Sequence, residues 1–335
     1  MERRSQKRPS RAAAVIMMDI ALLAAGLIFF ALLHHALPKA GNKLAELATP
    51  PPRPTQVAAA GAVPSLPPTP DPGGTVAAEA PLEQGDFSNT FPKENTGEDA
   101  LYSHQSDTLR VAVNRVQENG VTYFVADIYI RYIELFRTAF AKDQYGGGIH
   151  ESAKKIAERM NAVVATNGDY YGARSNGIVI RNGSLYRDSL YEDVCVVYLD
   201  GVMKTYAKAD FDLQQVIAGG AWQAWSFGPR LMENGAARVG IKNAVERANP
   251  RCALGYYEPG HYCLVVVDGR QSGYSDGMSL DDLASLFETL GCEEAYNMDG
   301  GATAQMIFEG QRVNQPAGGG RDCSDIIYFA DATGE

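Results

Sequence analysis

Residues 296–305 are the part of this 335-residue chain most informative about chemistry, and they read Tyr-Asn-Met-Asp-Gly-Gly-Ala-Thr-Ala-Gln. A predicted short strand carries Asn297 and Asp299 and leads into a turn at Gly300-Gly301, after which Thr303 follows. Paired glycines allow positive φ and let another group approach the main chain closely. Polar groups at such a turn are typical of a ligand site. The alternative is an ordinary hairpin turn in which Asp299 and Thr303 satisfy backbone groups.

Four further segments place polar side chains at the ends of predicted strands. They are residues 167–171 (Asn-Gly-Asp-Tyr-Tyr), 227–231 (Phe-Gly-Pro-Arg-Leu), 250–255 (Pro-Arg-Cys-Ala-Leu-Gly) and 265–280, which contains Asp-Gly-Arg. Arg321 adds a guanidinium group near the end of the chain. Carboxylate, amide and guanidinium groups thus recur at strand ends that lie far apart in the sequence.

Together these segments resemble the phosphodiester glycosidase family, whose animal members are N-acetylglucosamine-1-phosphodiester α-N-acetylglucosaminidases. The resemblance spans about residues 160–330, and its specific part is Asn-x-Asp-Gly-Gly after Asp-Gly-Arg and a helix. The family motif usually reads Asn-Leu-Asp-Gly-Gly-Gly-Ser. In this chain Met298 replaces Leu, and Ala302-Thr303 replaces Gly-Ser, which keeps a hydroxyl but loses the third glycine's flexibility.

The resemblance implies hydrolysis of a sugar that is joined through its anomeric oxygen to a phosphodiester. Such a reaction needs carboxylates near the anomeric carbon, because its transition state is oxocarbenium-like. It also needs cationic donors for the phosphate, and the planar guanidinium of arginine suits that task. A phosphate leaving group is a weak base, so strong general-acid assistance is less necessary than for an ordinary glycoside.

On this resemblance the expected catalytic carboxylates are Asp169 and Asp299. The expected substrate-binding residues are Asn167, Tyr170, Arg230, Arg251, Asp268, Arg270, Asn297, Gly300, Gly301, Thr303 and Arg321. Each has a structural alternative: turn capping for the aspartates, ion pairs for the arginines, and packing for the tyrosine. The five histidines show no ligand spacing and no Cys-x-x-Cys occurs, so neither a metal nor another cofactor is expected.

The N-terminal part of the chain differs in composition from the rest. Residues 1–11 carry five basic side chains against one glutamate, a charge of +4 that leaves −14 for the remainder of a chain of net charge −10. An acidic remainder argues against nucleic acid as a partner. The next apolar stretch, 15–37, is long enough to cross a bilayer, which predicts a transmembrane signal anchor behind a basic cytoplasmic tail, 1–14. A cleavable signal peptide is the alternative.

Residues 38–100 are predicted to be a Pro/Ala-rich disordered linker, since nine of the seventeen prolines lie between Pro50 and Pro72. The globular domain is then expected over 101–333, outside the cytoplasm and attached to the membrane through the N-terminal helix. Five cysteines are present, and the spacing assigns no disulfide.

The globular part is predicted to be a single mixed α/β domain of the α+β class with several β-hairpins. Asn-Gly or Asp-Gly turns mark three hairpins, at 182–183, 200–201 and 234–235, and the last is preceded by a predicted strand over 225–232. Helices are predicted over 152–160 and from Ser279 to Gly291, where serine caps the start and glycine ends the helix.

These observations predict an extracytoplasmic hydrolase that cleaves an N-acetylglucosamine-1-phosphodiester-like linkage in an envelope polymer or exopolysaccharide. The alternative is a non-catalytic module that binds carbohydrate or sugar phosphate during assembly of a cell-envelope polysaccharide.

Overall fold

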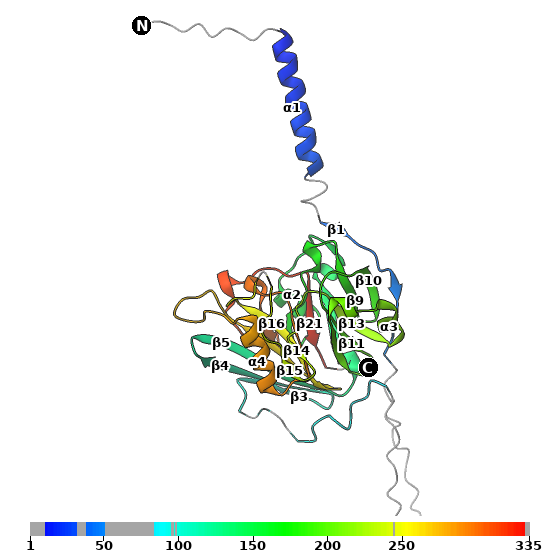
Figure 1. Cartoon of the computed structure of the whole chain (residues 1–335), viewed down its shortest axis with the longest axis vertical. Coiled ribbons are helices and arrows are strands. Elements are labelled where there is room, and N and C mark those ends of the chain that lie inside the picture. The colour runs from blue at the N-terminus through cyan, green and yellow to red at the C-terminus, as the bar shows by residue number, and fades with distance from the viewer. Residues whose placement is uncertain are drawn as a thin grey trace, which may run out of the picture.

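The structure, a computed structural model, describes residues 11–31, 38–50, 84–94, 97, 99–243 and 245–331. Its globular part is built mainly from three antiparallel sheets with a few helices, which confirms the predicted α+β class (Figure 1). The first sheet has the order β18-β16-β17-β5-β4-β3. Its strands are β3 (Tyr102–Gln105), β4 (Leu109–Glu118), β5 (Val121–Ile130), β16 (Arg251–Glu258), β17 (His261–Val267) and β18 (Glu294–Asn297).

The second sheet has the order β20-β19-β8-β21-β6 and the third the order β12-β11-β13-β9-β10-β2. The second contains β6 (Phe136–Phe140), β8 (Val164–Asn167), β19 (Met306–Phe308), β20 (Gln311–Arg312) and β21 (Asp325–Phe329). The third contains β2 (Ala45–Glu46), β9 (Gly177–Arg181), β10 (Ser184–Ser189), β11 (Val194–Tyr198), β12 (Met203–Tyr206) and β13 (Ala221–Trp225). Two short pairs complete the strands: β1 (Lys39–Ala40) with β7 (Gly146–Gly147), and β14 (Met232–Glu233) with β15 (Ala236–Ala237).

One apolar core joins the three large sheets. Buried side chains from all of them meet there, among them Phe136, Trp225, Tyr262, Tyr296 and Phe329. Burial of such large side chains is the main favourable term in folding. The core therefore fixes the positions of the strand ends that carry the polar motifs.

Helices cover the outer faces of the sheets. These helices are α2 (Ala153–Arg159), α3 (Leu213–Ala218) and α4 (Leu280–Leu290). The remaining described helix, α1 (Arg11–Ala31), belongs to no core cluster of the sheets. The apolar side of α4, with Leu283 and Phe287, packs on residues of β5, β16 and β17, whereas α2 packs on β8, β19 and β21. The predicted cap of α4 is confirmed, because Ser279 accepts a hydrogen bond from the amide of Asp282 and Gly291 is left-handed at φ 81°.

The hairpin at Asn182-Gly183 is confirmed, with positive φ of 49° and 72° joining β9 to β10. The strand predicted over 225–232 is wrong in its length, because β13 ends at Trp225 and β14 begins at Met232. Pro229 has no amide hydrogen to give to a neighbouring strand, and the amide of Ser226 is directed to the carboxylate of Asp169, 3.4 Å away. Residues 226–231 therefore run past the polar motifs as irregular chain.

Parts of the segment expected to be a disordered linker have defined structure. Residues 38–50 contain β1 and β2, which pair with β7 and β10. Phe87 and Phe91 are buried at 5% and 4% exposure. The segments on either side of the proline-rich stretch thus contain apolar side chains that are buried or partly buried against the globular part, which gives these segments a defined structure. The stretch 51–83 lies outside the described residues.

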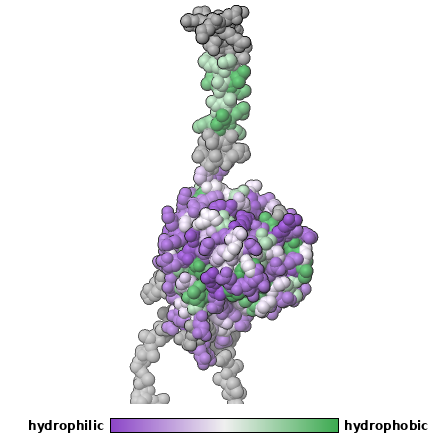
Figure 2. All heavy atoms as spheres, turned by 90° about the vertical axis from the view of Figure 1, so that its left-hand side faces the viewer, coloured by the Kyte–Doolittle hydropathy of each residue, from purple (hydrophilic) through white to green (hydrophobic). Residues whose placement is uncertain are grey.

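The N-terminal helix α1 carries exposed apolar side chains, which Figure 2 shows in green along the helix, while the globular part presents a mainly hydrophilic face in that view. In the part of the chain that the structure describes, no helix is both long enough and apolar enough to cross a membrane. The last six residues of the predicted anchor, 32–37, lie outside that part.

Candidate active site

Asn167, the last residue of β8, joins two of the polar motifs predicted from the sequence. Nδ2 of its side chain donates to the backbone carbonyl of Asp299 at 2.6 Å, and Oδ1 of the same side chain accepts from the backbone amide of Gln305 at 3.1 Å. The amide of Asp299 in turn donates to the carbonyl of Gly168 at 3.2 Å. Asn167 is fully buried, so these bonds hold 167–171 and 296–305 against each other.

Two glycines permit this close approach of backbone segments. A Cβ on Gly168 would lie 2.5 Å from Oδ1 of Asp325, and one on Gly300 would lie 2.5 Å from the carbonyl of Pro250. Both distances are too short for a carbon–oxygen contact. The glycines at these strand ends are thus required by packing between segments distant in sequence.

A pocket of about 200 Å³ lies at the segment 296–305, and we call it the Asp299 pocket. It is lined by residues 249–251, 297–302 and by Phe227, Val245, Arg270 and Arg321. Seven of the residues predicted for the site line it: Arg251, Arg270, Asn297, Asp299, Gly300, Gly301 and Arg321. Segments separated by more than 90 positions therefore converge on one hollow.

Asp299 is the carboxylate of this pocket, and its side chain is only slightly exposed. Burial raises the pKa of Asp299 to about 6, and the hydrogen bond from Thr303 and the charge of Arg321 only partly offset that effect. Nη2 of Arg321 lies 3.3 Å from Oδ2 of Asp299, and its Nε donates to Oγ1 of Thr303 at 2.9 Å. The Arg321 guanidinium also lies over the ring of Tyr170, 5.6 Å from its centroid. A carboxylate with this pKa exchanges its proton near neutral pH.

Asp169 is placed beside this pocket, in a more enclosed setting, and does not line it. Its carboxylate accepts hydrogen bonds from the amide of Tyr170 at 2.5 Å and from Nη2 of Arg174 at 2.8 Å. Nη2 of Arg181 lies 4.0 Å from Oδ2. These donors fix the orientation of the carboxylate.

Behind these contacts lies a fully buried ion pair that the sequence did not reveal. Nε of Arg181 donates to Oδ2 of Asp325 at 2.8 Å, and the amide of Asp169 donates to Oδ1 of Asp325 at 2.9 Å. Burial raises the pKa of Asp325 while the Arg181 charge opposes that rise. Asp325 thus links Arg181 to the backbone of Asp169.

Two guanidinium groups of the pocket have no carboxylate partner among the described residues. Arg251 is 2% exposed and donates to backbone carbonyls, including those of Met278 at 2.8 Å and Arg247 at 2.6 Å. Burial, together with the nearby charge of Arg270, lowers the pKa of Arg251 to about 10. Arg270 is exposed, has a strained positive φ of 58°, and donates to the side chain of Asn249 at 2.8 Å. Against the single carboxylate of Asp299, the pocket carries excess positive charge.

The same pocket offers an unused hydrogen-bond acceptor. Asn297 donates from its side-chain nitrogen to the carbonyl of Gly228 at 2.8 Å, which leaves its buried Oδ1 without a partner in the described part of the chain. Buried polar atoms are nearly always bonded. An unpaired acceptor at the wall of a pocket is therefore suited to a hydroxyl or amide of a ligand.

The family model for phosphodiester glycosidases matches residues 160–330, half of the chain and all of the segments just described. The chain belongs to the phosphodiester glycosidase family. Among curated proteins it is similar to the SPbeta prophage-derived uncharacterized protein YomE of Bacillus subtilis (strain 168), with 31% identity over 228 residues. The match covers 60% of this chain and 35% of YomE, so the chain spans about a third of that relative's length.

Two solved structures have a fold similar to that of this chain. One is the zebrafish N-acetylglucosamine-1-phosphodiester alpha-N-acetylglucosaminidase catalytic domain, auto-inhibited by its pro-peptide. It has a TM-score of 0.54 and 18% identity, over 68% of this chain and 85% of that one. The other is a hypothetical protein from Synechocystis, with a TM-score of 0.52 and 15% identity over 69% of this chain and 64% of that one.

Two residues predicted for the site, Arg230 and Asp268, do not line the Asp299 pocket. Arg230 donates to Glu233 at 2.8 Å and does not line the pocket. Asp268 is 1% exposed and accepts from Asn314 at 2.7 Å and from the hydroxyl of Tyr274 at 2.9 Å. Arg230 is thus engaged in an ion pair and Asp268 in bonds within a buried turn, as the structural alternatives for these residues expect.

No sequence motif marks Arg174, Arg181 and Asp325. The only signal is a charged residue at the end of an apolar strand, Arg181 in β9 and Asp325 in β21. Among the described residues no group of three or more histidine, cysteine, aspartate or glutamate side chains could hold a metal ion.

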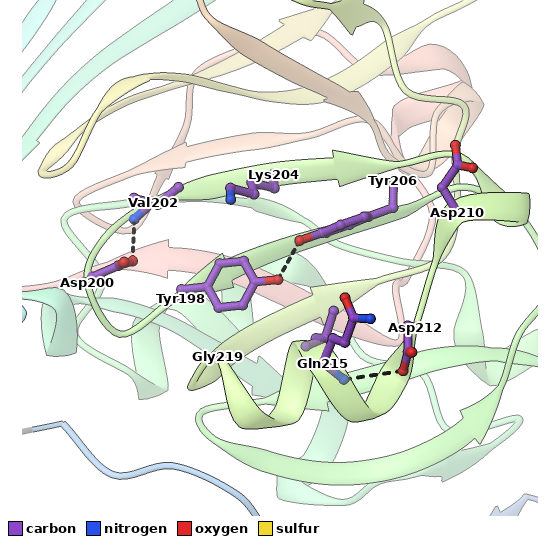
Figure 3. Close-up of a pocket in the computed structure, with 10 residues that line it drawn as sticks. Tyr198, Asp200, Val202, Lys204, Tyr206, Asp210, Asp212, Gln215 and Gly219 are labelled. Atoms are coloured by element: carbon purple, nitrogen blue, oxygen red, sulfur yellow. Dashed lines mark hydrogen bonds between the residues drawn. The ribbon is translucent and has the colours of Figure 1, made fainter.

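A separate pocket of about 330 Å³, which we call the Tyr198 pocket, contains none of the predicted site residues. Figure 3 shows the hydroxyl groups of Tyr198 and Tyr206 directed toward each other. Their oxygens are hydrogen-bonded at 2.6 Å. The charged residues that line this pocket are Asp200, Lys204, Asp210 and Asp212. Carboxylates outnumber cations there, the reverse of the Asp299 pocket.

Proposed function

We propose that this protein hydrolyses the bond between the anomeric carbon of a sugar and the oxygen of a phosphodiester, with an N-acetylglucosamine-1-phosphodiester-like group as substrate. The observation that carries the proposal is the Asp299 pocket, where one carboxylate and three guanidinium groups line a common hollow. Membership of the phosphodiester glycosidase family supports the same reaction.

The phosphate is bound by Arg251, Arg270 and Arg321 in this proposal. Arg251 and Arg270 have no carboxylate to neutralise them within the described residues, so an anion gains the full attraction of both charges. Guanidinium groups also donate bidentate hydrogen bonds to phosphate oxygens. As the bond to the anomeric carbon breaks, negative charge grows on the departing phosphate, and the same arginines stabilise it.

Asp299 acts on the sugar in its ionised form. Asp299 lines the pocket, and its carboxylate stabilises the positive charge that develops at the anomeric carbon. The carbon–oxygen bond to the phosphate breaks with its electron pair on the phosphate, water forms the new bond to the anomeric carbon, and the proton that the water loses passes to solvent. Asp169 is held in a fixed orientation beside it by Tyr170 and Arg174, and it adds a second negative charge near the same centre. The unpaired Oδ1 of Asn297 accepts a hydrogen bond from the sugar.

We further propose that the protein acts outside the cytoplasm, on a polymer of the cell envelope. A basic start followed by an apolar stretch is typical of a chain directed out of the cytoplasm. A sugar-1-phosphodiester in an envelope polymer is then the expected substrate. A fusion of the chain to a reporter that is active only outside the cytoplasm checks this location, and an inactive reporter would contradict it.

The proposed activity is tested with a methyl phosphodiester of α-N-acetylglucosamine-1-phosphate. We expect the wild-type protein to release free sugar, and Asp299→Asn and Asp169→Asn each to reduce kcat/KM at least about 100-fold while remaining folded by circular dichroism. Asp210→Asn, in the Tyr198 pocket, is the matched control and should keep full activity.

Full activity in both site variants would remove these carboxylates from the mechanism. Binding of the diester or of an envelope polymer by the wild-type protein, with no sugar released over a long incubation, would instead favour a binding module.

A further inference from the structure

A groove of about 630 Å³ is lined by Arg174, whose guanidinium lies over the ring of Phe227 in the Asp299 pocket, and we call it the Lys39 groove. It is lined by residues 39–41, 145–148, 171–175 and 187. Its first part comes from the segment next to the proline-rich stretch, which is held in place by pairing of β1 with β7. Residues remote from the family motifs therefore contribute to it.

Arg174 connects the groove to the reaction centre. It lines the groove and donates through Nη2 to Oδ1 of Asp169 at 2.8 Å. Its guanidinium carbon also lies 5.2 Å from the ring centroid of Phe227, which lines the Asp299 pocket. One side chain thus forms the boundary between the two hollows.

The groove carries positive charge that the described residues do not neutralise. Three of its lining residues are basic (Lys39, Arg174 and Arg187), and none of the described residues that line it is acidic. The charge of Arg174 is matched by Asp169. Arg187 donates only to neutral oxygens, including the carbonyls of Arg174 at 2.7 Å and Tyr171 at 2.9 Å. Lys39 is exposed and has no carboxylate partner within the described ranges.

The shape and surface of the groove suit a sugar chain. Gly147 and Gly148 in its lining are exposed and carry no side chain, which allows a ligand to approach their backbone closely. The half-buried ring of Tyr145 stacks on the ring of Tyr171, with 5.2 Å between the centroids, and its hydroxyl accepts from Nε of Arg187 at 3.1 Å. Ligand sites usually measure roughly 300–1,000 Å³. The Asp299 pocket, at about 200 Å³, suits one sugar phosphate, and the groove has room for more of the chain.

We propose that the Lys39 groove binds a neighbouring anionic repeat of the substrate, so that the enzyme acts on a glycan polymer whose units are joined by phosphodiesters. This inference rests on the function proposed above, since it extends the substrate of that site from one diester to a chain of them. Lys39 attracts the next phosphate, and the exposed backbone of Gly147 and Gly148 contacts the intervening sugar.

The Tyr198 pocket offers a matched comparison. Its strand β12 is at one edge of the third sheet, whereas Arg187 lies in β10, next to the edge strand β2. Lys204 is exposed like Lys39 but lines a pocket that also contains three carboxylates (Figure 3). Reversal of its charge changes the net charge of the protein equally without touching the groove.

The test compares a single methyl diester of α-N-acetylglucosamine-1-phosphate with an oligomer of several such units. We expect Lys39→Glu to lower kcat/KM for the oligomer roughly three- to tenfold, the range for loss and reversal of one exposed charge contact, and to leave the single diester unchanged. Lys204→Glu should change neither. The oligomer's advantage in the wild-type protein should shrink with added salt, because the groove is exposed to solvent.

Oligomer binding to the Asp299→Asn variant, with and without Lys39→Glu, is measured by titration calorimetry and separates the two proposals. Weaker binding when Lys39 is changed supports the groove even if the wild-type protein turns over neither substrate, a result that would refute only the hydrolase. Turnover of the single diester with no effect of Lys39→Glu on oligomer turnover or binding would overturn the groove and leave the hydrolase standing. An equal effect of Lys39→Glu and Lys204→Glu would also overturn it.

Discussion

Replacement of Asp299 by asparagine should stabilise the folded protein at neutral pH, because it removes a charge that folding buries. Burial raises the pKa of Asp299 from 3.8 to about 6. Each pKa unit corresponds to about 1.4 kcal/mol, so the ionised carboxylate disfavours the folded state by about 3 kcal/mol. Asparagine keeps the shape of the side chain without that charge.

The sign of the pH dependence follows from the direction of the shift. The folded pKa lies above the unfolded one, so the contribution of Asp299 to stability is fully present below about pH 4 and is lost as the pH rises through about 6. The free energy of unfolding of Asp299→Asn minus that of the wild-type protein should therefore rise with pH. The expected gain is about 3 kcal/mol between about pH 4 and pH 7.

Urea unfolding followed by circular dichroism, at several pH values across that range, measures this difference. Only its change with pH is diagnostic, because the substitution has its own constant effect on packing. Asp210→Asn is the control, since that carboxylate is exposed at the Tyr198 pocket and its difference from the wild-type protein should stay flat. A flat difference for Asp299→Asn would refute the argument that this carboxylate is held in a desolvated site.

Two further predictions follow from the same contacts. If ionised Asp299 does the chemistry, kcat/KM for the diester should fall below about pH 6, approaching tenfold per pH unit, and a pH-independent rate would exclude that role. Arg181→Met should destabilise the protein by about 3–5 kcal/mol at neutral pH, because it leaves Asp325 buried and unpaired. The double variant with Asp325→Asn should recover part of that loss in urea unfolding, and a loss below about 1 kcal/mol in Arg181→Met would contradict the pairing.

Local rules explain why much of the fold could be predicted from the sequence. The helix from Ser279 to Gly291 and the turn at Asn182-Gly183 depend on residues within a few positions of each other, so their geometry can be read from a short window. The end of β13 could not be predicted in this way, because the amide of Ser226 donates to Asp169, a residue 57 positions earlier, and not to a neighbouring strand. A longer strand was the natural expectation from its apolar pattern alone.

Some residues of the candidate site could be predicted from local sequence patterns, and others could not. Asp299 and Arg321 belong to segments with recognisable glycine-rich patterns, and the structure brings them together at 3.3 Å. The buried pair of Arg181 and Asp325 depends on β9 and β21 meeting near Asp169, and no local pattern encodes that meeting. The Lys39 groove is less accessible still to sequence reasoning, because the segment that supplies Lys39 was expected to be disordered.

Hydrolysis of the methyl diester in ¹⁸O-labelled water is the most direct test of the central claim, that this site breaks the bond between the anomeric carbon and oxygen. Water that attacks the sugar leaves its oxygen on the sugar, so the account predicts methyl phosphate without label, measured by mass spectrometry. Incorporation of ¹⁸O into the phosphate product, or release of the sugar as its 1-phosphate, would show attack at phosphorus and contradict the account.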